Sequence, residues 1–202
     1  MYSDTIKGLN KLFYASLLMP IVYFCLQYAT GNTLIWVIIL IIAFILHLIG
    51  LKSISKDIYV VNVAFYLTII EFIISLFSTG DSTFPSIIVA ILHSITYLCL
   101  FFPLSKKLKE RNETLLAYFG CIIAIVAIID QFFNLIWLVH MENKLIQLHS
   151  YYLKWDDKAA IADKLLNDTV LVLLITVAIY ICHSVFFRKS SKAFEQIQNN
   201  IS

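Results

Sequence analysis

Long apolar runs separated by short polar segments form the main pattern of this chain. A transmembrane helix needs about 20 mostly apolar residues, and six runs approach or exceed this length. The predicted spans are residues 12–29, 33–51, 59–78, 84–104, 115–139 and 168–188. A membrane β-barrel would instead show alternating segments of about ten residues. We therefore predict an all-α fold, a polytopic membrane helix bundle of about six transmembrane helices in one domain, residues 1–202.

The composition agrees with a membrane protein. Hydrophobic residues make up 60% of the 202 residues and charged residues 14%, whereas soluble domains carry about 25% charged residues. The cysteines lie inside apolar runs without a C-x-x-C pair, at Cys25, Cys99, Cys121 and Cys182. This spacing predicts neither a zinc site nor a disulfide framework, and no cofactor is expected. The net charge of +2 gives no support for nucleic-acid binding.

Basic residues cluster in the connections on one side of the predicted bundle. Eleven of the fifteen lie there, at Lys7, Lys11, Lys52, Lys56, Lys106, Lys107, Lys109, Arg111, Arg188, Lys189 and Lys192. The short connections on the opposite side, around Gly31 and Gly80, carry none. Because short cytoplasmic loops are enriched in Lys and Arg, we predict that both termini are cytoplasmic. Abundant Ile, Lys and Asn favour a bacterial source. The expected location is the cell inner (plasma) membrane.

The tryptophans support the same orientation. Trp36, Trp137 and Trp155 all map to the predicted outer interface, where indole rings are enriched. Basic residues and tryptophans are independent signals, and both place the termini on the inner side.

The segment 140–167 is the only sizeable part expected outside the bilayer. It lacks Gly and Pro and spaces its apolar residues helically, so it is predicted to be an outer helical segment between the fifth and sixth spans. Asp156 or Asp157 could cap a helix leading into the sixth span. With Tyr151 and Tyr152 nearby, the segment could lie on the membrane surface as a lid. The alternative is a helical hairpin that merely connects the two spans.

Ionisable residues inside predicted spans are candidates for a functional site, because lipid-exposed charges are costly. At 1.5 Å per residue, Glu71 in the third span lies ~18 Å from the inner end of its helix, and Asp130 in the fifth lies ~22 Å from its own. His93 lies ~14 Å from the outer end of the fourth span. These three residues are predicted to share a layer in the outer half of the bundle. His47 and His183 are expected in an inner layer, where packing is the favoured role.

Small and polar residues repeat at helical spacing along five spans. These stripes are Ser16, Pro20, Tyr23 and Gln27; Ala64, Thr68, Glu71 and Ser75; Ser86, Ala90, His93 and Tyr97; Gly120, Ala124, Ala127, Gln131 and Asn134; and Thr169, Thr176, Tyr180 and His183. Such faces allow membrane helices to approach and hydrogen-bond one another, which predicts an inward polar seam. The candidate ligand-binding residues are Glu71, His93, Asp130, Gln131 and Asn134. The alternative is that these groups only hold the helices together.

The polar seam favours a small transport or ligand-binding membrane subunit that binds a polar or cationic ligand, or relays protons. The sequence contains no nucleotide-binding loop, so ATP-driven transport would need a partner ATPase subunit. Besides the lipid bilayer, a partner membrane subunit or a homo-oligomer is the expected association. A non-catalytic immunity, regulatory or pore-forming protein acting through helix association is the second interpretation.

An intramembrane enzyme is the third interpretation and has the least support. His93 and Cys99 could act as base and nucleophile, but a spacing of six residues places them about 240° apart around a helix. Neither H-E-x-x-H nor G-x-S-x-G occurs in the chain. No catalytic residue and no metal ligand is therefore predicted.

Overall fold

The protein folds into six α-helices, and the residues that the structure describes contain no β-strand. This computed structural model describes residues 2–28, 33–77, 83–149 and 155–200. The helices are α1 (Ser3–Tyr28), α2 (Thr33–Ile54), α3 (Val61–Phe77), α4 (Thr83–Lys109), α5 (Thr114–Leu148) and α6 (Trp155–Asn199). The predicted all-α helical bundle is confirmed, and each predicted span overlaps one helix.

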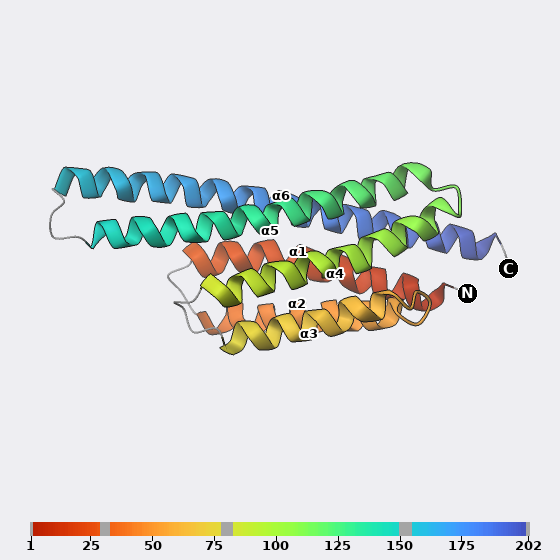
Figure 1. Ribbon diagram of the computed structural model, residues 1–202. Coiled ribbons are helices and arrows are strands. Elements are labelled where there is room, and N and C mark those ends of the chain that lie inside the picture. The colour runs from red at the N-terminus through yellow and green to blue at the C-terminus, as the bar shows by residue number, and fades with distance from the viewer. Residues whose placement is uncertain (1, 29–32, 78–82, 150–154, 201–202) are drawn as a thin grey trace.

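The helices run side by side along one common direction (Figure 1). α1 packs most extensively against α2 and α6, while α4 packs against α3 and α5, and α5 also contacts α6. Both chain termini lie at the same end of the bundle (Figure 1), which we call the terminal end. The opposite end, where α1 leads to α2, α3 to α4 and α5 to α6, is called the far end.

The α5–α6 hairpin extends beyond the other helices at the far end (Figure 1). Segment 140–167 is helical as predicted, but its described residues continue α5 and α6 instead of forming a separate helix. The lid interpretation is therefore wrong, because no Gly or Pro interrupts either helix there. α6 already begins at Trp155, so Asp157 lies within its first turn and does not cap it. Tyr151 and Tyr152 lie outside the described residues.

Four of the six helices are long and apolar enough to cross a membrane, judged over the described residues. They are α2, α4, α5 and α6, so the predicted number of six spans is not confirmed. The described part of α3 has 17 residues and stops at Phe77. This part is about 26 Å long at 1.5 Å per residue, whereas the hydrocarbon core is about 30 Å thick. α1 carries Asp4, Lys7 and Lys11 in its first turns.

The outer surface of the bundle is apolar over much of its area. On α2, the side chains of Leu34, Ile38, Ile41 and Ile45 are all exposed, with Leu34 at 66%. Soluble monomeric proteins rarely expose large contiguous apolar patches to water, whereas lipid tails solvate such surfaces. The long apolar helices and this surface together identify the chain as an integral membrane protein.

The densest part of the hydrophobic core lies toward the terminal end. Large side chains there are fully buried, including Leu104 and Leu108 on α4 and Phe186 and Phe194 on α6. The start of α1 is fixed by Asp57, whose Oδ2 accepts hydrogen bonds of 2.8 Å from the backbone N–H and hydroxyl of Thr5. The polar cavities lie instead in the middle and far parts of the bundle.

Candidate functional site

A buried hydrogen-bonded network joins α3 to α4 in the middle of the bundle. Oε2 of Glu71 lies 2.7 Å from Nδ1 of His93. Its other carboxylate oxygen, Oε1, accepts a hydrogen bond of 2.6 Å from the hydroxyl of Thr96. Glu71 is only 7% exposed, and a buried carboxylate requires such partners to offset the loss of hydration. The predicted inward orientation of Glu71 and His93 is thus observed, and their contact is specific.

Glu71, His93 and Thr96 line a central cavity of about 300 Å³. All six helices contribute to its wall, including Ser16 and Met19 from α1, Phe44 and His47 from α2, Thr68 and Ser75 from α3, Tyr97 and Phe101 from α4, Gln131 from α5, and Tyr180, His183 and Phe187 from α6. Its volume is at the lower end of the range found for small-molecule sites. The wall combines aromatic and apolar surfaces with a few polar groups, as such sites usually do.

Histidines of three different helices line this central cavity. His47 and His183, expected in a separate layer with a packing role, line it together with His93. The ring of Tyr97 bridges two of them, with its centroid 4.5 Å from that of His93 and 5.2 Å from that of His183. His47 and His183 thus border the same cavity as His93, while their expected depth in a separate inner layer stays a prediction.

His183 has an unusual environment for a polar side chain. It is 3% exposed, and its ring contacts those of Phe101 and Tyr180 at centroid distances of 5.1 Å and 5.7 Å. Its Nε2 has no hydrogen-bond partner among the described residues. Leaving such an atom unsatisfied costs free energy, so its expected partner is water or a ligand within the cavity.

Asp130 and Asn134 lie in a second cavity of about 300 Å³ between α4, α5 and α6. The Nδ2 group of Asn134 donates a hydrogen bond of 3.0 Å to Oδ2 of Asp130. Asp130 is 6% exposed, and its Oδ1 has no hydrogen-bond partner among the described residues. Asp130 lines this second cavity and not the central one, although Tyr97, Gln131 and Tyr180 border both. That it shares one ligand site with Glu71 and His93 stays a prediction.

Gln131 connects these cavities. It lines the central cavity, the Asp130 cavity and a third space of about 320 Å³. The third space is bordered by Ser75, Ser86 and Leu138, and Ser86 lies in the first turn of α4 at the far end. The candidate residues therefore fall into adjoining cavities that lead from the far end toward Glu71, with Gln131 at their junction.

Most of the predicted polar stripes face inward. Ser16, Thr68, Tyr97 and Tyr180 line the central cavity, and Gly120, Ala124 and Ala127 are buried on α5. The side chains of Tyr23 and Gln27 lie outside the described part of α1. Sequence reasoning did not identify Thr96, although it lies three residues after His93. That spacing places both residues on neighbouring positions of one helix face.

Cys99 lines neither the central cavity nor the Asp130 cavity. It packs against the hydrophobic core, whereas His93 lines the central cavity. The structure therefore does not bring this pair together as a nucleophile and its base. Over the described residues, no three His, Cys, Asp or Glu side chains are grouped closely enough to hold a metal ion.

No protein-family model, no curated protein and no solved structure matches this chain. A functional conclusion therefore depends on the chemistry of the cavities, because a helical bundle by itself does not define a function. The strongest chemical feature among them is the buried Glu71 carboxylate at the wall of the central cavity.

Proposed function

We propose that this protein is a small transport or ligand-binding membrane subunit, and that its central cavity binds a small cationic ligand. The single observation that carries this proposal is the position of Glu71. Its carboxylate is buried within the bundle and borders a cavity reached by all six helices.

The hydrogen bonds of Glu71 leave it able to interact with a ligand. His93 and Thr96 occupy one position on each carboxylate oxygen, while each such oxygen has two lone pairs. A ligand ammonium group can therefore be bound without breaking the network. Ionisable groups inside membrane helices are expensive and are commonly retained for binding or proton transfer.

The remaining wall suits a small amine with an apolar or aromatic part. Phe44, Tyr97 and Tyr180 come from three different helices around the cavity. Aromatic faces attract ammonium groups, more strongly when the site is dry. Nitrogen atoms of His47 and His183 add hydrogen-bonding capacity at the same wall.

Ligand binding can be measured through thermal unfolding of the purified protein in detergent. The panel consists of primary, tertiary and quaternary ammonium compounds, with uncharged isosteres of each. We expect at least one cationic compound to raise the unfolding temperature while its isostere does not. Glu71→Gln keeps the size of the side chain and is expected to weaken that binding at least tenfold, since the opposite charge is lost.

Glu142→Gln is the matched control. It makes the same chemical change on α5, at a residue that borders none of the cavities described above, and it should bind the compound as the unchanged protein does. Binding of equal strength by Glu71→Gln would contradict the proposal. So would a panel in which no cation stabilises the unchanged protein.

A further inference from the structure

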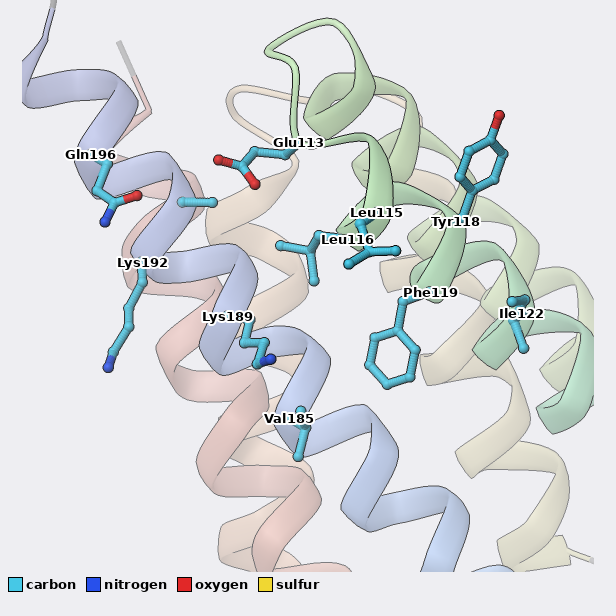
Figure 2. Close-up of a pocket in the computed structure, with 11 residues that line it drawn as sticks. Glu113, Leu115, Leu116, Tyr118, Phe119, Ile122, Val185, Lys189, Lys192 and Gln196 are labelled. Carbon is cyan, nitrogen blue, oxygen red and sulfur yellow. The ribbon is translucent and has the colours of Figure 1, made fainter.

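A large groove lies between α5 and α6 at the terminal end (Figure 2). None of its lining residues borders the polar cavities. Its volume is about 640 Å³. The first turns of α5 supply Leu115, Leu116, Tyr118, Phe119 and Ile122, and α6 supplies Val185, Lys189, Lys192 and Gln196. We call this feature the α5–α6 groove. Several of its apolar side chains have no protein cover, with Leu115 87% and Ile122 57% exposed.

The α6 wall of the groove changes from apolar to polar along its length, whereas the α5 wall from Leu115 to Ile122 is apolar and aromatic. Val185 and Ile122 lie at one end in Figure 2, whereas Glu113 and Gln196 lie at the other. On α6 the lining residues Val185, Lys189, Lys192 and Gln196 share one helix face and span about 16 Å. A phospholipid has the same order over a similar length, with an acyl chain, a phosphate and a polar headgroup.

The lysines of the groove are available to a ligand. Lys189 and Lys192 are exposed and make no ion pair with any described carboxylate. By contrast, Arg188 donates a hydrogen bond to Asn10 and lies over the ring of Phe13. A third cation is near the groove, because Nζ of Lys109 lies 5.7 Å from the ring centroid of Tyr118.

We propose that the α5–α6 groove binds an anionic phospholipid, with its acyl chain against α5 and its phosphate at Lys189 and Lys192. An apolar groove alone would accept any lipid, and charge complementarity selects the anionic class. Basic pockets between membrane helices are known to bind anionic headgroups in this way. The groove is a separate site from the central cavity and does not depend on the function proposed for it.

Glu113 favours a headgroup that donates hydrogen bonds. It borders the polar end of the groove with Gln196, and both side chains carry acceptor oxygens. The hydroxyls of a glycerol headgroup can donate to them while the phosphate pairs with the lysines. Phosphatidylglycerol is therefore the lipid chosen as the probe.

The experiment measures binding of dioctanoyl phosphatidylglycerol to the full chain in a neutral detergent, by the shift in unfolding temperature during titration. Dioctanoyl phosphatidylcholine has the same tails without net charge, and inorganic phosphate has the anion without tails. We expect phosphatidylglycerol alone to stabilise the protein at low concentration. Lys189→Gln/Lys192→Gln should weaken its binding about 30-fold, from the contribution of two lysines at a lipid surface.

Two further double variants separate the groove from general charge effects. Lys7→Gln/Lys106→Gln removes the same charge from exposed residues at the terminal end that do not line the groove, and it should keep full affinity. Lys189→Arg/Lys192→Arg keeps the charge and should retain binding within about threefold, because Arg also pairs with phosphate.

Several results would overturn the proposal. Equal stabilisation by phosphatidylcholine would show a lipid contact without recognition of charge. Equal stabilisation by inorganic phosphate would show a simple anion site. An equal loss of affinity in Lys7→Gln/Lys106→Gln would mean that binding depends on the overall charge of the protein. Unchanged affinity in Lys189→Gln/Lys192→Gln would exclude the groove as the binding site.

Discussion

The buried polar residues of this bundle differ in how completely they are hydrogen-bonded. Both carboxylate oxygens of Glu71 have partners, from His93 and Thr96. Nε2 of His183 and Oδ1 of Asp130 have none among the described residues. An unsatisfied buried group costs about 1–3 kcal/mol, so these two atoms lower stability unless water or a ligand in the adjoining cavity pairs with them. Each of these residues borders a polar cavity, which is where a ligand would compensate that cost.

His183→Phe tests whether this residue serves binding or packing. Phe keeps an aromatic ring, somewhat larger than imidazole, among the rings of Tyr97, Phe101 and Phe187 and removes the unsatisfied nitrogen. We expect the free energy of unfolding to rise by about 1 kcal/mol, while affinity for the cationic ligand of the central cavity falls. Chemical unfolding in micelles and the thermal-shift titration measure the two effects.

His149→Phe is the control for this prediction. His149 is exposed at the end of α5, and its Nδ1 lies 2.8 Å from the carbonyl oxygen of Leu145. Neither stability nor binding should change by more than about 0.5 kcal/mol, as is usual at the surface. A loss of more than about 1 kcal/mol in His183→Phe would mean that the imidazole is needed for packing.

Small residues allow two helices of the bundle to approach each other closely. α1 and α2 approach closely where Gly8 faces Gly50. A Cβ atom on Gly8 would lie 2.6 Å from the carbonyl oxygen of Gly50 and 2.5 Å from Cγ1 of Ile54. Backbone atoms cannot move aside as a flexible side chain can, so this contact requires glycine. Close approach through small residues is a common way of packing membrane helices, since it increases van der Waals contact.

Gly8→Val is expected to separate α1 from α2 and to lower the free energy of unfolding by about 2 kcal/mol, because the added methyl groups overpack the contact. Unfolding in micelles by a denaturing detergent measures this loss. The control Ala159→Val enlarges an exposed side chain on α6 and should change stability by less than about 0.5 kcal/mol. Equal stability of the two variants would show that the close helix contact is not needed.

At the scale of the whole molecule, charge and packing are unevenly distributed. The terminal end carries most of the basic residues, the densest apolar core and the α5–α6 groove. The far end carries the protruding α5–α6 hairpin, in which acidic residues such as Asp157 and Asp163 are interleaved with lysines. The positive-inside rule places the terminal end in the cytoplasm, and we retain this orientation as a prediction.

Cysteine labelling in intact cells tests the orientation. In a variant without its four native cysteines, Ala159→Cys on the hairpin should react with a membrane-impermeant maleimide. Lys109→Cys at the terminal end should react only after permeabilisation. Both positions are exposed in the structure, so a difference reports sidedness and not burial. If only Lys109→Cys were labelled in intact cells, the orientation would be opposite to the one predicted.

Local pattern accounts for much of the fold. The helical secondary structure follows from the long apolar runs, because only helices and closed barrels satisfy the backbone hydrogen bonds within lipid. Faces such as Ala124 and Ala127 were also predictable, since residues three or four apart share one side of a helix. Helix ends were less predictable: without Gly or Pro near 140–167, nothing in the local sequence marks where α5 leaves the bundle.

The sequence by itself determined that this chain is a helical membrane protein and which helix faces turn inward, because both depend on residues close together along the chain. Only the tertiary structure decided which polar groups meet. It brought Thr96 and His93 to Glu71, placed His47 and His183 at the same cavity, and put Asp130 in a neighbouring one. These distances depend on the rotation and axial shift of whole helices, which are set by packing between residues far apart in sequence.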